Sequence, residues 1–165
     1  MAPVATEPSA SPAATRSPSA APAPTPAEAA AARVASSRAD VDALLVHVFE
    51  HAAVGIAVVG LDEAEREVVL EANASFAGIF GRPIGALRGT RALSASVDPA
   101  HAPAVARAME ELLRGSVVVH RGEYRFLRAD GERMWLDLTA SLVRDADGAP
   151  RHRLVHLVDV TAQRE

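Results

Sequence analysis

The sequence predicts an α+β fold: a five-stranded antiparallel sheet with its helices gathered on one face, preceded by a disordered Ala/Pro-rich tail. Met134 and four aliphatic residues recur at every second position up to Leu142, which is the period of a strand with one buried face. Turn dipeptides at Asp130-Gly131 and Asp147-Gly148 predict hairpins to a strand before this one and a strand after it. Residues 73–113 have helical spacing, so helices are expected to separate these three strands from an earlier hairpin.

Residues 1–36 are predicted to form the disordered tail. Of the first thirty residues, 25 are Ala, Pro, Ser or Thr, and 7 of the 11 prolines lie there. Proline interrupts helices and cannot donate to a sheet ladder, and the stretch has too few large apolar residues to form a core. All six aromatic residues lie between Phe49 and Trp135, which places the core beyond the tail.

Composition and charge exclude several classes of protein. The 17 basic residues are all arginine and are outnumbered by 21 acidic residues, so the net charge of -4 argues against a nucleic-acid-binding domain. The absence of cysteine excludes disulfides, thiolate metal sites and cysteine redox switches. No apolar run approaches the ~18 residues of a membrane span, and the N-terminus lacks the pattern of a signal peptide. We therefore expect a cytoplasmic protein with no membrane partner.

An amphipathic helix is predicted over residues 37–52. Ser37 and Asp40 have the spacing of a capping box, which favours a helix start there. Apolar residues then recur at helical spacing and form one stripe: Val41, Leu44, Leu45, Val48, Phe49 and Ala52. Such a stripe packs on a sheet or on a second copy of the helix. The residues expected in a dimer interface are Leu45, Val48 and Phe49.

A first hairpin is predicted after this helix. Residues 54–61 are apolar and rich in β-branched side chains, an acidic run occupies residues 62–67, and residues 68–70 resume a strand. The clustered carboxylates suggest acid–base catalysis, but hairpin tips are normally charged and no nucleophile or phosphate-binding glycine loop accompanies them. We expect a solvated turn and no enzymatic activity.

Short helices are predicted to follow the hairpin. Asn73 can cap the first of them, on which Phe76 and Phe80 share a face. A longer helix is expected to begin at Asp98-Pro99, because proline is tolerated where a helix starts, and to end at Gly115.

The last third of the chain predicts three consecutive antiparallel strands, over residues 117–128, 134–143 and 153–160. Trp135 is out of phase with the apolar face of its strand and is expected on the outer surface of the sheet. His156 shares its parity with three apolar residues, and it enters the core if that set faces inward: Leu154, Val158 and Val160. There it would be a hydrogen-bonded core histidine or a ligand-contacting residue.

Several short motifs follow one another along the chain: Asn73-x-x-Phe76-x4-Gly81 with Leu87-x-Gly89, then Glu123-Tyr124-Arg125-Phe126 with Asp130-Gly131 and Trp135, and finally Asp159-Val160-Thr161. In this order, and with the predicted elements, they resemble a PAS domain, a sensory module of bacterial signalling proteins. The resemblance covers residues 53–161. It marks residues 162–165 as the start of a linker to an output domain.

The resemblance implies both a pocket and a route for a signal. In the family, the space between the inner face of the sheet and the short helices holds a small molecule or is filled by side chains. Here it would be lined by Phe76, Phe80, Leu136, Leu138 and His156. Asp159 and Thr161 would end the last strand and couple it to the outgoing helix.

The resemblance also bears on cofactors and metals. PAS domains that sense blue light through a flavin adduct carry a cysteine within the stretch equivalent to residues 89–93, so this chain cannot perform that photochemistry. Flavin binding without an adduct and haem binding both stay open. A haem would draw its ligand from His101, which we expect to be a solvent-exposed helix cap instead. His47 and His51 stand at i and i+4, but no third ligand accompanies them and no metal site is predicted.

Three functions are compatible with these residues. The first is a sensory module that binds a small ligand or a partner protein and relays the change through its C-terminal strand. The second is a dimerisation scaffold whose core is filled by its own side chains. The third is the regulatory end of a signalling enzyme such as a histidine kinase or a diguanylate cyclase. Partners would accordingly be a second copy of the chain or an effector domain.

Overall fold

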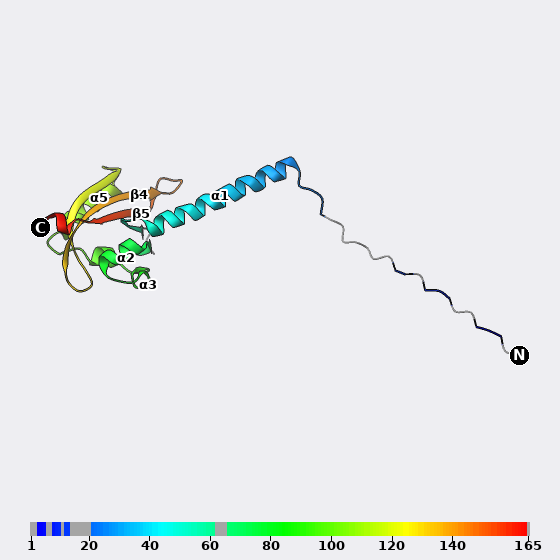
Figure 1. Ribbon diagram of the computed structural model, residues 1–165. Coiled ribbons are helices and arrows are strands. Elements are labelled where there is room, and N and C mark those ends of the chain that lie inside the picture. Colours follow the sequence, from blue (N-terminus) through cyan, green and yellow to red (C-terminus); the bar gives the residue numbers. More distant parts are fainter. Residues whose placement is uncertain (1–2, 6–7, 11, 14–20, 62–65, 165) are drawn as a thin grey trace. The chain divides into compact units, whose positions relative to one another are not determined.

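The computed structural model of the protein describes residues 3–5, 8–10, 12–13, 21–61 and 66–164. The chain divides into two compact units, residues 1–39 and residues 40–165 (Figure 1). The sheet and the hydrophobic core belong to the second unit.

The first helix, α1, spans Pro26–His51, so the predicted start at Ser37 is wrong. Residues 26–36, which were expected to be part of the disordered tail, are helical. Among the helices that the structure describes, none has the length and hydropathy needed to cross a membrane.

The earlier start of α1 has a local cause. Thr25 and Glu28 form a capping box: the Glu28 N–H donates to the Thr25 hydroxyl at 3.2 Å, and the Thr25 N–H donates to the Glu28 carboxylate at 2.7 Å. Pro26 takes the first helical position, where its missing N–H is not needed, and the alanine-rich stretch behind it has high helix propensity.

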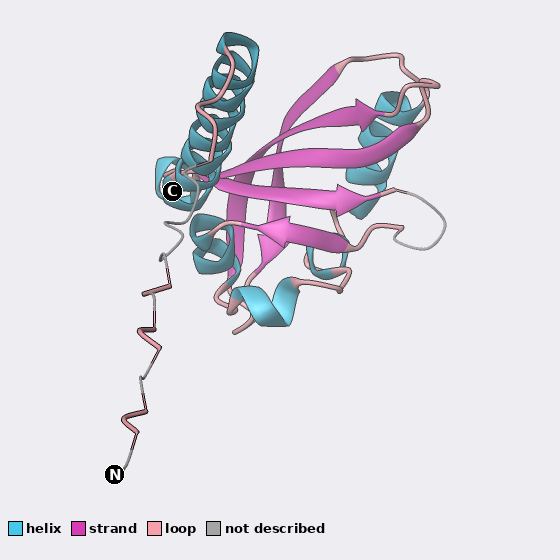
Figure 2. Ribbon diagram, turned by 90° about the vertical axis from the view of Figure 1, so that its right-hand side faces the viewer, coloured by secondary structure: helices cyan, strands magenta, loops and turns pink. Residues whose placement is uncertain are grey.

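Five antiparallel strands form one sheet in the order β2-β1-β5-β4-β3, and they lie side by side in Figure 2. Their bounds are β1 Gly55–Gly60, β2 Val69–Ala72, β3 Val119–Leu127, β4 Arg133–Arg144 and β5 Pro150–Asp159. The fold class predicted from the sequence is confirmed. The pairing of β1 with β5 brings the first hairpin against the last strand, so the two ends of the domain share the centre of the sheet.

Short helices connect β2 to β3. They are α2 Ala74–Phe80, α3 Ile84–Leu87, α4 Ala92–Ala95 and α5 Ala102–Leu113, and the final turn of the chain is α6 Thr161–Arg164. Side chains of α2 to α5 pack with the inner face of the sheet in one core: Phe76, Phe80, Leu87, Leu93 and Leu112. The longer helix, α5, starts at Ala102 and not at Asp98, because the Asp98 side chain accepts the Ala100 N–H at 2.9 Å and holds a turn ahead of the helix.

The predicted inward face of β4 is confirmed. On β5 the inward residues have the opposite parity to the set predicted with His156. Met134, Leu136, Leu138 and Ala140 are buried. On β5 the buried residues are Arg153, Val155 and Leu157, so His156 does not enter the core. His156 lies opposite Thr139 and Ile56 on the outer face. Apolar residues occupy both faces of β5, and an arginine takes one inward position, so parity alone could not assign the faces.

Asn73 connects three parts of the domain through its carboxamide, and none of its surface is exposed. Its oxygen accepts the N–H groups of Ile56 at 2.9 Å and Phe76 at 3.0 Å. Asn73 therefore caps the N-terminus of α2 and connects it to β1. Its nitrogen donates to the carbonyls of Phe49 at 2.8 Å and Val54 at 3.0 Å, which holds the end of α1 and the turn into β1. All the hydrogen-bonding capacity of this buried side chain is therefore used.

We expect Asn73→Ala to lower the free energy of unfolding by about 3–5 kcal/mol, because it leaves backbone donors and acceptors unpaired in a buried place. Ser75→Ala is the matched control, since Ser75 makes one bond to the same segment, from its hydroxyl to the Ala52 carbonyl at 2.6 Å. It should cost about 1 kcal/mol. Urea unfolding measures the free energy of unfolding of both variants. Equal losses would show that the four hydrogen bonds of Asn73 stabilise the domain no more than the single bond of Ser75.

Candidate functional site

A cavity of about 350 Å³ lies between α4, α5 and the inner face of the sheet. Its inner wall is made by β3, β4 and β5, and its outer wall by the side of α5 that faces them. Most of the lining side chains are apolar, and the polar ones are Glu67, Ser94, Glu110 and Arg153. The apolar lining includes Leu93, Val97, Val105, Met109, Phe126, Leu138, Ala140 and Val155.

Of the predicted pocket residues, only Leu138 lines this cavity. Phe76, Phe80 and Leu136 are buried in the core beside it, and His156 lies on the opposite face of the sheet. The rings of Phe76 and Phe80 stand 4.8 Å apart, and Phe126 meets Phe80 edge-on at 6.1 Å. Phe76 and Phe80 of α2 fill the core under that helix, whereas Phe126 lines the cavity beneath α5.

The cavity contains a buried ion pair that sequence reasoning missed. Arg153 Nη1 and Nη2 donate to the two Glu67 carboxylate oxygens at 2.9 Å and 2.6 Å. The Arg153 side chain is 4% exposed and that of Glu67 is 31% exposed, so the arginine belongs to the core and the glutamate to its rim. The sequence feature that could have indicated this ion pair is the arginine within the apolar strand of residues 153–160.

Glu67 has two further features. Its backbone has φ 61°, a left-handed conformation that non-glycine residues seldom adopt. Its N–H donates to the Gly60 carbonyl at 2.9 Å, which closes the connection between β1 and β2. The expected acidic turn at residues 62–67 lies within the described residues only at Arg66 and Glu67, and Glu67 is the partner of a buried arginine there.

A second charged cluster fixes the segment before α5. Asp98 lies 3.5 Å from Arg125 and 3.4 Å from Arg133, and its side chain is 7% exposed. The Ala100 N–H and these guanidinium groups hold the pKa of Asp98 below its usual range. The cluster attaches this segment to β3 through Arg125 and to β4 through Arg133, and none of its three residues lines the cavity.

The histidines considered for cofactors and metals lie away from the cavity. His101 precedes α5, half-buried, with its ring edge-on to Tyr124 at 6.2 Å and to Trp135 at 5.2 Å. The expected solvent-exposed cap is thus partly covered by aromatic rings. His47 and His51 stack at 4.2 Å on α1. Across residues 21–61 and 66–164, no three His, Cys, Asp or Glu side chains gather as a metal would require.

The end of β5 is held against the start of β4. Asp159 accepts the Thr161 N–H at 2.9 Å and the Thr161 hydroxyl at 2.6 Å. The Thr161 hydroxyl in turn accepts the Trp135 N–H at 2.9 Å, and the Val160 N–H donates to the Trp135 carbonyl at 2.9 Å. Asp159 and Thr161, which are predicted to couple the last strand to the outgoing helix, are therefore linked by hydrogen bonds to a single residue of β4, Trp135.

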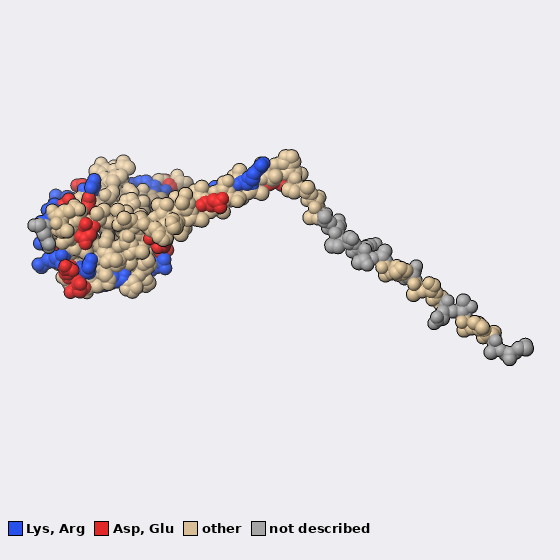
Figure 3. Space-filling model, viewed as in Figure 1, with Lys and Arg blue, Asp and Glu red and all other residues tan. Residues whose placement is uncertain are grey.

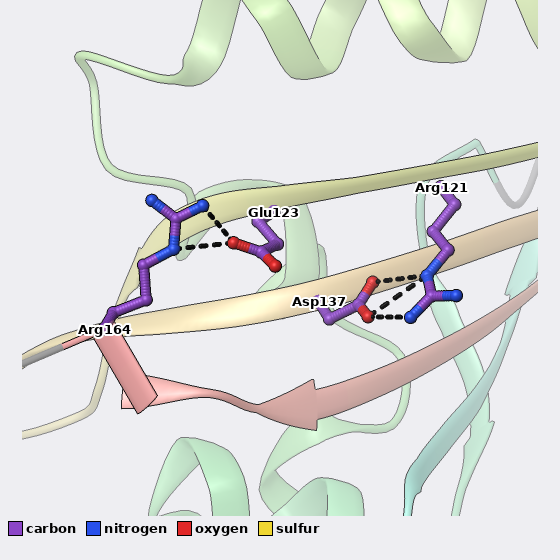
Figure 4. A network of polar contacts seen from close by, with 4 residues as sticks. All are labelled: Arg121, Glu123, Asp137 and Arg164. Atoms are coloured by element: carbon purple, nitrogen blue, oxygen red, sulfur yellow. Dashed lines mark hydrogen bonds and ion pairs between the residues drawn. The ribbon is translucent and has the colours of Figure 1, made fainter. Parts of the chain in front are cut away.

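Arg164 adds a further contact that the sequence did not indicate. Its guanidinium lies 4.4 Å from the ring centroid of Trp135 and pairs with Glu123 of β3, with Nε at 2.6 Å from the carboxylate (Figure 4). The neighbouring pair of Arg121 and Asp137 stands on the same outer face. Figure 3 shows that acidic and basic side chains are interspersed over the visible face of the domain.

The comparison with known families agrees with this geometry. The sequence profile described as "PAS fold" matches residues 49–165. The chain belongs to the PAS family. PAS domains are generally sensory, non-catalytic modules of signalling proteins, and the sheet with its short helices is the expected PAS architecture. No curated protein matches the chain in sequence.

Solved PAS structures share the fold at low sequence identity. The PAS domain of a Colwellia psychrerythraea protein has a TM-score of 0.66 at 15% identity, over 74% of this chain and 98% of its own. The N-terminal domain of a Marinobacter aquaeolei diguanylate cyclase with a PAS/PAC sensor has 0.58 at 17%, over 68% and 99%. The PAS domain of a Burkholderia thailandensis LuxR-family regulator, in complex with ethanol, has 0.55 at 17%, over 69% and 95%.

Glu67→Gln should lower the free energy of unfolding of this PAS domain by about 2–3 kcal/mol, because the buried Arg153 loses its charged partner while Glu67 itself is partly solvated. Glu71→Gln is the control: its partner is Arg88, and both side chains are about half exposed. It should cost about 0–1 kcal/mol. Chemical denaturation at low and high salt distinguishes the two variants. A similar loss of unfolding free energy in Glu67→Gln and in Glu71→Gln would mean that solvent reaches Arg153.

Proposed function

We propose that this PAS domain is a sensory module that binds a small molecule in the cavity beneath α5 and relays its presence through the ends of β4 and β5. The cavity itself carries the proposal. Its volume of about 350 Å³ falls within the ~300–1,000 Å³ that ligand pockets occupy, and its walls are mostly apolar with a few polar groups. A cytoplasmic location stays a prediction.

Strands β4 and β5 line the cavity and also contact the final turn, α6. Leu138 and Ala140 of β4 and Val155 of β5 line the cavity, while Trp135 of β4 and Asp159 of β5 make the contacts with the outgoing turn. A molecule that favours one arrangement of these strands therefore also favours one arrangement of α6. A molecule with equal affinity for both arrangements would bind without signalling.

The relatives support the sensory proposal in two ways. Related PAS domains belong to a diguanylate cyclase and to a transcriptional regulator, which makes a larger signalling protein the natural setting for this domain. One of them was solved with a small molecule, ethanol. Regulation of a histidine kinase or diguanylate cyclase by this chain is the corresponding hypothesis for its output.

A variant with a filled cavity tests ligand binding. Ala140 is fully buried and lines the cavity, so Ala140→Leu should occupy part of it, while Ser141→Leu adds a side chain of the same size on the outer face of the same strand. A library of small apolar molecules is screened by thermal shift. Molecules that stabilise the wild type should also stabilise Ser141→Leu and should lose most of that effect in Ala140→Leu. Equal stabilisation of both variants would place binding outside the cavity.

A dimerisation role is the second candidate, because α1 carries an exposed apolar stripe. Val41, Leu44, Leu45 and Val48 are 53%, 60%, 61% and 55% exposed, and their spacing places them on one side of the helix. A second copy of the same stripe is the proposed occupant. Phe49, the third residue of the predicted interface, is half-buried in its own domain, and its carbonyl accepts from Asn73.

Sedimentation velocity over a dilution series tests the dimer. The double variant Leu45→Glu with Val48→Glu should dissociate at least tenfold more readily than the wild type, because it places charges in the seam. Val46→Glu is the control, since Val46 is 63% exposed but projects from a different side of α1. A dimer that survives the double variant, or that Val46→Glu disrupts equally, would rule out this stripe as the interface.

A further inference from the structure

We infer that the molecule that fits the cavity is uncharged and mainly apolar, with one hydrogen-bond acceptor that faces Arg153. This inference rests on the proposed function of the cavity as a ligand site. It follows from the charges around the cavity, from the donors that remain unused there, and from the apolar character of the remaining walls.

The charges argue against an anionic ligand. Arg153 is the cationic residue among the described lining residues, and both its Nη groups are already bound to the Glu67 carboxylate. The other charged lining residue, Glu110, is an acid whose partner Arg114 is 71% exposed. An entering carboxylate would therefore meet two acidic residues and one neutralised guanidinium. A cationic ligand would have to lose its hydration between mostly apolar walls, and both acidic lining residues already have arginine partners.

The donors argue for an acceptor on the ligand. The Nε atom of Arg153 is buried and has no hydrogen-bond partner among the described residues. The Ser94 hydroxyl donates to the Arg91 carbonyl at 3.2 Å, so it is partly committed. A buried donor without an acceptor is unfavourable, and a ligand oxygen that accepts from Nε removes that cost. This gives a carbonyl or ether oxygen a preferred position in an otherwise apolar cavity.

A ligand that bonds to Arg153 Nε should also displace side chains of the protein. Nε is covered by its surroundings, so a ligand that bonds to it must shift the Arg153 side chain and, through the ion pair, Glu67. Glu67 holds its left-handed backbone conformation at the end of the β1–β2 connection, just before β2. Ligand binding should therefore be visible at the Glu67 amide as well as at the amides that line the cavity.

Three probes of nearly identical planar shape test the inference: acetophenone, α-methylstyrene and benzoate. They place a ketone oxygen, a methylene group and a carboxylate at the same position of a phenyl ring. Each is titrated into the 15N-labelled protein at neutral pH, and Kd is taken from the amide shifts of Leu138, Ala140 and Val155. Acetophenone should bind about five- to tenfold more tightly than α-methylstyrene, as one added hydrogen bond of ordinary strength implies, and more tightly than benzoate.

A matched pair of variants identifies the donor. The double variant Arg153→Met with Glu67→Gly removes the donor and its counter-ion together, leaves no unpaired buried charge, and places glycine where φ is positive. α-Methylstyrene should still bind, which shows that the cavity is intact, while the preference for acetophenone should disappear. Arg153→Lys keeps a cation opposite Glu67 but has no equivalent of Nε, and it should lose most of the same preference.

The outcomes separate the inference from the proposed function. If benzoate binds most tightly, or if acetophenone and α-methylstyrene bind the wild type equally, the cavity takes ligands but the inferred ligand class is wrong. If the acetophenone preference persists in both Arg153 variants, Arg153 is not the donor and the inference fails. If none of the probes shifts the cavity amides at millimolar concentration, the cavity is not a ligand site and the proposed function fails with it.

Discussion

The buried carboxamide of Asn73 fixes the arrangement on which the rest of the domain depends. It holds the end of α1, the start of β1 and the first turn of α2 through four hydrogen bonds. Gly55 allows this close approach, because a Cβ there would lie 2.9 Å from the Ile79 side chain and 3.1 Å from the Phe76 backbone. Once α2 is fixed, Phe76 and Phe80 fill the core beneath it, and the remaining space lies under α5.

Two ion pairs of the domain have different surroundings. The pair of Glu67 and Arg153 lines the cavity, with the arginine side chain 4% exposed and the glutamate side chain 31% exposed. The pair of Glu123 and Arg164 stands on the outer face of the sheet, half exposed, where it holds the last turn over Trp135. Removing one partner of a buried pair costs more than removing one partner of an exposed pair, so loss of Glu67 should destabilise the domain more than loss of Glu123.

The sequence was sufficient for the fold and insufficient for the cavity. The alternation on β4 and the turn glycines at 131 and 148 gave the sheet, because period and turn chemistry are local properties. The predicted start of α1 at Ser37 is wrong because Ser37 and Asp40 also have capping-box spacing, whereas the box that starts the helix is formed by Thr25 and Glu28, among the prolines of the expected tail. The inward face of β5 could not be predicted locally, because one of its inward residues is Arg153, whose partner Glu67 lies 86 positions earlier in the chain.

The most direct test of coupling between cavity and exit uses Trp135, the sole tryptophan of the chain. Trp135 contacts Arg164 and Thr161 on the outer face and does not line the cavity. Its indole N–H gives a separate peak in a 1H–15N spectrum, which can be followed while acetophenone is titrated into the protein. Coupling predicts that the indole peak moves with the same Kd as the amides of Leu138 and Ala140. An indole peak that stays in place while those amides saturate would contradict it.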